Sequence, residues 1–105
     1  MLLVVDVGNT HITLGLFDGK DLKTTFRMTA KQPRTSDEYG IQLCDLLVHR
    51  DYHVKDITDV IISSVVPSLD VIMKSAFEKY FHITPIYIGP GIKNGMNIKI
   101  EIIRR

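Results

Sequence analysis

A carboxylate and two hydroxyls stand close together near the start of the chain. Asp6 follows the apolar run Leu2 to Val5, and Thr10 and Thr13 come shortly after it. An Asp at the end of a buried strand is costly unless it has a partner. A tight turn can direct backbone N–H groups and hydroxyls at an anion, and a carboxylate beside it can face the metal that accompanies a nucleotide phosphate. These residue types therefore indicate a phosphate site.

The predicted phosphate-binding segment consists of Asp6, Val7, Gly8, Asn9, Thr10, His11, Ile12 and Thr13. Gly-Asn between two apolar runs is a hairpin signal, and Gly8 can take a positive φ without steric cost. The alternative is a hairpin turn with no ligand, because a motif this short recurs by chance. The order of the remaining elements distinguishes these alternatives.

The elements that must position this segment follow from apolar periodicity and turn signals. Thr35 and Glu38 match a capping box, and Ser68 is expected to cap a second helix. The continuous apolar run Val60 to Ile62 is typical of a strand in the middle of a sheet covered on both sides. After the first hairpin and a turn at Asp18-Gly19, the predicted elements are a strand at 22–28, a helix at 36–49, a strand at 57–64, a helix from 68 to about 80, a strand at 83–88 and an edge-like strand at 96–103.

The resulting order, β-β-β-α-β-α-β, predicts an α/β domain with a mixed sheet and helices on its faces. The two helices are expected to leave part of the sheet uncovered. This pattern resembles the ribonuclease-H-like (actin-like ATPase) domain of the actin, hexokinase and Hsp70 superfamily, in which the first hairpin is the phosphate loop. The agreement between motif and topology favours the phosphate loop over the turn alone.

Six motifs resemble type III pantothenate kinase in their order and spacing. They are Asp6-Val-Gly-Asn-Thr10, Arg27-Met28, Thr35-Ser-Asp-Glu-Tyr-Gly40, Ser63-Ser-Val-Val-Pro67, Lys79-Tyr-Phe81 and Gly89-Pro-Gly-Ile-Lys-Asn-Gly95. The resemblance implies ATP-dependent phosphorylation of pantothenate to 4′-phosphopantothenate, the first step of coenzyme A synthesis. It implies that residues 6–13 bind the ATP phosphates and that Asp6 helps to bind Mg²⁺. It also implies a monovalent cation, K⁺ or NH₄⁺, and a homodimer in the full-length family.

The chain departs from that family after its glycine-rich loop. Members continue through Gly-Ala-Asp-Arg, whose Asp is the expected catalytic base, whereas this chain reads Asn97-Ile-Lys-Ile-Glu-Ile-Ile-Arg-Arg105. No catalytic residue is therefore assigned, and Lys93 and Gly95 are the candidate substrate contacts. We expect a single incomplete domain over residues 1–105, with the second domain absent. This chain alone should lack useful kinase activity, because orientation and water exclusion account for roughly 7–11 kcal/mol of a barrier.

Composition excludes several classes of protein. The 105 residues are 45% hydrophobic and 24% charged with a net charge of +1, which fits one globular domain and gives no electrostatic footprint for nucleic acid or a membrane surface. Cys44 is the only cysteine, so no internal disulfide forms, and a cytoplasmic location is expected. Two alternatives to the kinase stay open: a non-catalytic ATP-binding or transcriptional accessory module of the same family, and a sugar or acid kinase of the superfamily.

Overall fold

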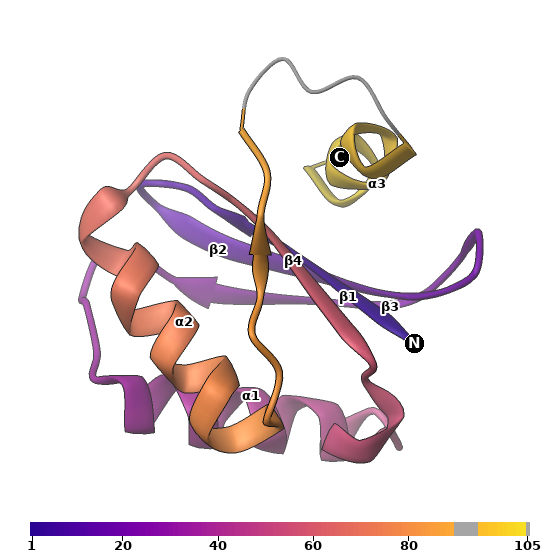
Figure 1. The fold of residues 1–105 in the computed structure, drawn as a ribbon, viewed down its shortest axis with the longest axis horizontal. Coiled ribbons are helices and arrows are strands. Elements are labelled where there is room, and N and C mark those ends of the chain that lie inside the picture. The colour runs from indigo at the N-terminus through magenta and orange to yellow at the C-terminus, as the bar shows by residue number, and fades with distance from the viewer. Residues whose placement is uncertain (90–94, 105) are drawn as a thin grey trace.

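The computed structural model describes residues 1–89 and 95–104. A five-stranded sheet carries two helices on one face and a third helix on the other (Figure 1). The strands are β1 (Leu2–Val7), β2 (His11–Asp18), β3 (Asp21–Thr29), β4 (Asp59–Ser64) and β5 (Ile86–Tyr87). The helices are α1 (Ser36–His49), α2 (Pro67–Phe81) and α3 (Gly95–Arg104), with a short 3₁₀ turn, η1 (Val54–Asp56).

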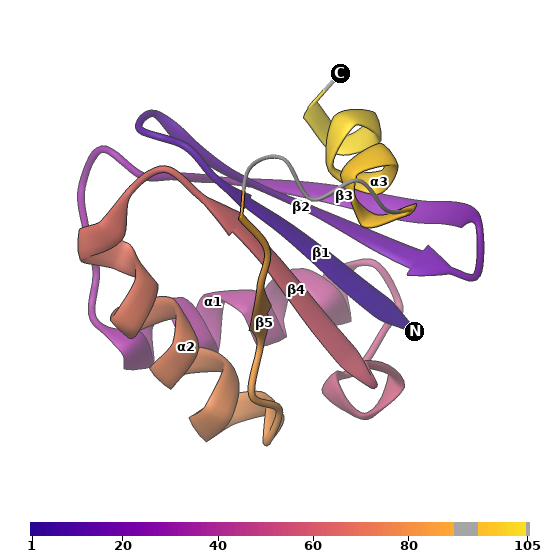
Figure 2. The same cartoon turned by 45° about the horizontal axis from the view of Figure 1, so that its top comes forward.

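The sheet is mixed, with the order β3-β2-β1-β4-β5 (Figure 2). The first three strands form an antiparallel meander, while β4 and β5 are added parallel to β1. Gly19 makes the turn between β2 and β3 at φ +60°, a conformation that costs glycine little. In β4, between β1 and β5, Val60, Ile61 and Ile62 are all buried. The predicted topology and the central strand are therefore confirmed.

Helix α1 begins and ends where the sequence predicts. The Glu38 N–H donates to Thr35 Oγ1 (3.2 Å), and the Thr35 N–H donates to Glu38 Oε1 (3.1 Å). This capping box satisfies amide groups that a helix start leaves without an internal partner. Tyr39, Leu43 and Leu47 form the buried stripe that holds the helix on the sheet.

Helix α2 corrects the prediction of a Ser68 cap. The helix begins at Pro67 and its N-cap residue is Val66, which makes no side-chain cap. Proline is well suited to a first helical position because its φ is already helical and it has no amide hydrogen to satisfy. The hydroxyl that acts locally belongs to Ser64, whose Oγ accepts from the Val66 N–H (3.1 Å).

Strand β5 is shorter than the predicted strand at 83–88. Its ladder joins only Ile61 to Ile86 and Ile62 to Tyr87. Pro85 precedes it, and proline has no N–H with which to extend a ladder.

Within the described residues, none of the helices is both long and apolar enough to pass through a membrane.

Two separate apolar clusters lie on the two faces of the sheet. The larger joins α1 and α2 to the inward-facing side chains of β1 to β4, with Leu3, Leu14, Tyr39, Met73 and Phe77 among its fully buried members. The smaller consists of Val4 and Phe17 from the sheet and Ile100 and Ile103 from α3.

Helix α3 overturns the prediction of an edge-like strand at 96–103. Ile98 and Ile100 alternate with polar residues, which mimics a strand, but Ile100 and Ile103 are also spaced to share one helical face. That face is buried on the sheet, whereas Ile98 is 65% exposed. Gly15 of β2 makes room for the helix, because a Cβ at this position would overlap Ile103 Cγ2. The sheet face expected to be uncovered is therefore partly covered by α3.

Candidate functional site

Two polar residues of the predicted site, Asp6 and Thr13, lie in a line of polar residues across the sheet. Strand pairing places Asp6 of β1 opposite Thr13 of β2, and Thr13 opposite Arg27 of β3. On its other side Asp6 lies opposite Ser63 of β4. Directly opposite residues share a face, and Asp6 is two residues from Val4, which packs against α3. We call Ser63, Asp6, Thr13 and Arg27 the polar row, which lies on the α3 face.

The turn between β1 and β2 stands at one end of this row. The Gly8 N–H donates to His11 O (2.9 Å), and Thr10 O accepts from the Ala30 N–H (2.9 Å). Gly8 does not adopt the positive φ that glycine permits, since Gly19 is the one glycine with positive φ in the described ranges. Gly8 serves a close approach instead, because a Cβ there would lie 3.2 Å from His11 O.

The predicted phosphate-binding residues divide between side-chain and backbone roles. The side chains of Val7 and Ile12 are buried in the larger core, so only their backbone can face a ligand. Asn9, Thr10 and His11 are exposed at the turn. No hydrogen bond among the described residues uses the N–H groups of Asn9 or Thr10, which leaves two donors available to an anion.

Asp6 has the partner that its position requires. Arg104 Nε donates to Asp6 Oδ2 (2.9 Å) and Arg104 Nη2 donates to Oδ1 (3.1 Å), while Nη1 donates to Glu101 Oε1 (3.0 Å). The Asp6 side chain is 19% exposed and that of Arg104 is 44% exposed. The hydrogen bonds to Asp6 hold the pKa of the Arg104 guanidinium above its ordinary value.

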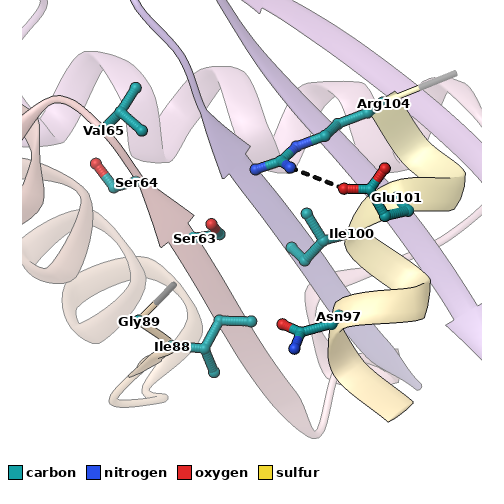
Figure 3. Close-up of a pocket in the computed structure, with 9 residues that line it drawn as sticks. All are labelled: Ser63, Ser64, Val65, Ile88, Gly89, Asn97, Ile100, Glu101 and Arg104. Carbon is teal, nitrogen blue, oxygen red and sulfur yellow. Dashed lines mark hydrogen bonds and ion pairs between the residues drawn. The ribbon is translucent and has the colours of Figure 1, made fainter. Parts of the chain in front are cut away.

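A cavity of about 380 Å³ opens between the end of β4 and α3. Figure 3 shows Ser63 on one wall, Asn97 on the other and the Arg104 guanidinium reaching across from α3. Ligands of open α/β sheets bind at the carboxyl ends of the strands, and this cavity has that position. Its lining residues are Ser63, Ser64, Val65, Ile88, Gly89, Asn97, Ile100, Glu101 and Arg104.

A second cavity, of about 340 Å³, adjoins the Arg27 end of the polar row. Arg27, Arg50 and Thr13 are among its lining residues. Arg50 is already engaged, since its Nη1 donates to Thr24 Oγ1 (2.6 Å). The Arg27 side chain makes no hydrogen bond or ion pair with any described residue, so its charge is available beside Thr13. The sequence motif contained Arg27, but sequence reasoning gave it no role.

The donor groups fit a metal that arrives with a phosphate better than a resident ion. Among the described residues, no three His, Cys, Asp or Glu side chains gather closely enough to hold a metal. Mg²⁺ is commonly held by one or two carboxylates together with phosphate oxygens and water. Asp6, beside the turn and largely shielded from solvent, can supply such a carboxylate.

The two candidate substrate contacts gain no support from the geometry. Lys93 lies outside the described residues. Gly95 is the first residue of α3, and it has no side chain with which to bind a ligand. Sequence reasoning also missed Arg104, and the signal for it was the need of Asp6 for a partner.

Comparison with known proteins gives a family match over nearly the whole chain. The profile of the family described as type III pantothenate kinase matches residues 2–104. A type III pantothenate kinase from Agathobacter rectalis is 50% identical over 98 residues, which cover 93% of this chain and 38% of the relative. One from Bifidobacterium longum is 45% identical over 101 residues, covering 96% and 40%. The chain thus spans about two-fifths of the length of these curated relatives.

Solved structures support the fold. An ROK hexokinase from Thermus thermophilus matches with a TM-score of 0.58 at 13% identity, covering 83% of this chain and 34% of that protein. A protein assigned provisionally as an N-acetylglucosamine kinase, from Porphyromonas gingivalis, matches with a TM-score of 0.60 at 17% identity, covering 83% and 33%. These likenesses concern the fold alone, and they confirm the predicted α/β fold, which matches about a third of each of these structures.

Proposed function

This chain belongs to the type III pantothenate kinase family, and we propose that its residues 6–13 bind the phosphates of ATP·Mg²⁺. One observation carries the proposal: strand pairing aligns Asp6 with Thr13 beside an exposed turn with unused N–H donors. Hydroxyls and N–H groups bind phosphate oxygens, and a carboxylate next to them faces the accompanying metal.

Each member of the polar row has a separate task in this proposal. Asp6 holds Mg²⁺, directly or through water, and the ion neutralises charge on the phosphates when bound. Thr13 offers its hydroxyl to a phosphate oxygen from the neighbouring strand. Arg27, opposite Thr13, adds a positive charge at the end of the row, and its side chain makes no ion pair with a described residue.

For the whole protein we propose the reaction that its relatives' names indicate, phosphorylation of pantothenate with ATP. Coenzyme A synthesis, a monovalent cation, a homodimer and a cytoplasmic location belong to the same proposal. The chain contains no Gly-Ala-Asp-Arg sequence, so no residue in it is assigned to accept the proton of the pantothenate hydroxyl. The chain alone is therefore expected to bind nucleotide without turnover, and steady phosphopantothenate formation in a coupled assay would contradict this.

Calorimetric titration of ATP, with Mg²⁺ and with a chelator, tests the binding proposal. Mg²⁺ should tighten binding to the wild-type chain, and Asp6→Asn should abolish that Mg²⁺ dependence, because the amide lacks the charge that attracts the ion. Asp59→Asn is the matched control, since Asp59 is exposed and pairs with Leu2 at the opposite end of β1. The proposal fails if no nucleotide binds, or if Asp6→Asn behaves like the wild type.

A further inference from the structure

We propose that Arg104 is a resident cation of the phosphate site, with which Mg²⁺ must compete for Asp6. The proposal deepens the proposed function and rests on it in one respect, namely that Asp6 faces the metal carried by the nucleotide. It goes beyond that function because it makes α3 of this chain an intramolecular competitor for its own ligand.

Both oxygens of the Asp6 carboxylate already accept hydrogen bonds. The guanidinium meets Oδ2 through Nε and Oδ1 through Nη2, at 2.9 and 3.1 Å. Such bidentate pairs are among the stronger hydrogen-bonded ion pairs because two parallel bonds share one charge pair. A metal cation that approaches Asp6 is therefore repelled by the positively charged guanidinium, which is bonded to the carboxylate oxygens that the metal needs.

The packing of α3 keeps Arg104 at this position. Ile100 and Ile103 are buried against Val4 and Phe17, four residues and one residue before Arg104. In the middle of the helix, Lys99 Nζ donates to Gly19 O (3.1 Å) and lies 4.8 Å from the centroid of the Phe17 ring. The helix thereby holds the guanidinium near Asp6 at a high effective concentration.

Glu101 orients the same guanidinium from within α3. Its Oε1 accepts from Arg104 Nη1 (3.0 Å), and the two residues are three positions apart on the helix. The arginine therefore has carboxylates on two sides. Figure 3 shows its side chain beside Glu101, extending from α3 across the sheet. A solvated arginine at the end of a helix would have neither constraint.

The competition should weaken binding without abolishing it. The Arg104 side chain is 44% exposed, and ion pairs at this degree of exposure are weak. Its release requires movement of one side chain, while Ile100 and Ile103 remain packed. Removing the guanidinium should thus raise the affinity of the site for a metal roughly two- to fivefold.

Titration with Mn²⁺ alone, followed by paramagnetic broadening of backbone amide signals at residues 6–8, tests the competition without nucleotide. The Mn²⁺ concentration at half broadening should fall about two- to fivefold in Arg104→Gln. Arg104→Lys, which keeps the charge without the two-pronged contact, should be intermediate. Lys55→Gln should match the wild type, because η1 lies at the far end of β1, where the Met1 ammonium donates to Asp56 O (2.7 Å). Equal midpoints in Arg104→Gln and the wild type, or no broadening in either, would overturn the proposal.

Titration with ATP·Mg²⁺ separates this inference from the proposed function. Arg104→Gln should bind more tightly than the wild type by a similar factor, and adding Arg104→Gln to Asp6→Asn should change nothing. If no variant binds ATP·Mg²⁺ while the Mn²⁺ midpoints still shift, the proposed function fails and the competition stands. If ATP·Mg²⁺ binds and neither titration responds to Arg104→Gln, the competition fails alone. Weaker nucleotide binding by Arg104→Gln would show that Arg104 serves the phosphates instead, and would overturn the inference.

Discussion

The two faces of the sheet differ in what they bury and in what they carry. The face under α1 and α2 holds the larger core, with Tyr39, Met73 and Phe77 fully buried. The face under α3 buries little beyond Val4, Phe17, Ile100 and Ile103, and it carries the polar row. The residues that stabilise the fold therefore lie on one face of the sheet, and the residues of the proposed binding site lie on the other.

This separation explains why the strand residues alternate as they do. In β1, Leu3, Val5 and Val7 point toward the larger core, while Val4 and Asp6 point toward α3. A substitution on the first face should act on folding, and one on the second should act on binding or on the docking of α3. The predictions below test that division, from the largest expected effect to the smallest.

Truncation of Phe77 should have the largest effect. The ring is fully buried and packs against Phe81, with centroids 5.0 Å apart. Phe77→Ala should lower the free energy of unfolding by about 3–5 kcal/mol through lost burial and the cavity that remains. Denaturant unfolding measures this. Val71→Ala on the same helix is the control and should change stability by less than about 0.5 kcal/mol, since Val71 is 76% exposed. Equal effects of the two substitutions would contradict the assigned core.

A side chain at Gly15 should loosen α3 while the larger core stays intact. The new Cβ would overlap Ile103 Cγ2, and overpacking of this kind costs about 1–3 kcal/mol. In Gly15→Ala, amide hydrogen exchange should therefore quicken across residues 96–104 and remain slow in β1 and β4.

A second substitution tests the cause of that loosening. Combining Gly15→Ala with Ile103→Ala should remove the overlap and partly restore protection of α3, because the smaller side chain clears the new methyl group. Unchanged exchange in Gly15→Ala would contradict the close packing of α3 over this position. Uniform loss of protection across the sheet would show that the two faces are not independent.

Loss of the α1 cap should destabilise the first face by a smaller amount. Thr35→Ala removes the hydroxyl that accepts from the Glu38 N–H, and loss of such a cap typically costs about 1 kcal/mol. Thermal or denaturant unfolding would register the change. Thr58→Ala serves as control, because its hydroxyl lies outside any helix start. An equal loss in both variants would rule out a specific capping effect.

The same cap predicts a pH dependence. Hydrogen bonds from the Thr35 backbone and side chain hold the pKa of Glu38 below its ordinary value of 4.5. A carboxyl whose pKa is lower in the folded state stabilises the fold above the unfolded-state pKa, and this contribution is lost as the pH falls through the folded-state value. Glu38→Gln should therefore be less stable than the wild type at neutral pH, with the difference shrinking below pH 4.5. A difference that does not vary with pH would refute the assignment.

The smallest effect on folding should come from Arg104→Gln. Ion pairs at this exposure contribute roughly 0–1 kcal/mol, so global stability should change little. The same variant should nevertheless alter the affinity of the site for a metal. That result would show that Arg104 acts on binding at the α3 face and not on folding. A loss of stability comparable to that of Phe77→Ala would instead make Arg104 a structural residue.

The first face could be predicted from the sequence because its signals are local. The capping box of Thr35 and Glu38 and the stripe of Tyr39, Leu43 and Leu47 fix α1 without reference to the rest of the chain. The central strand β4 was likewise recognisable from its unbroken apolar run, although the structure begins it at Asp59 rather than residue 57.

The second face could not be predicted because its contacts are distant in sequence. The alternation of Ile98 and Ile100 with polar residues favours a strand, and only burial of Ile100 and Ile103 on the sheet selects a helix. The Asp6 to Arg104 pair joins residues 98 positions apart, so no local pattern announces it.

One irregularity in the pairing of β2 with β3 decides which residue of β3 belongs to the polar row. Asp18 pairs with Asp21 beside the turn, and counting back from that pair would set Thr13 opposite Phe26. The pairing shifts between Leu16 and Phe17, so that Thr13 faces Arg27 instead. Bulges of this kind redirect side chains. Here the shift keeps Phe26 in the larger core and brings Arg27 to the polar row.

The most direct test of the central claim is to map backbone amide and arginine Nε–H shifts by NMR while ATP·Mg²⁺ is added to this chain. We predict that the largest changes fall within residues 8–13 and that the Arg104 Nε–H signal moves with them as its bonds to Asp6 are released. Shifts confined to the surface of α1 and α2, or no shifts at saturating nucleotide, would contradict a phosphate site at the first hairpin.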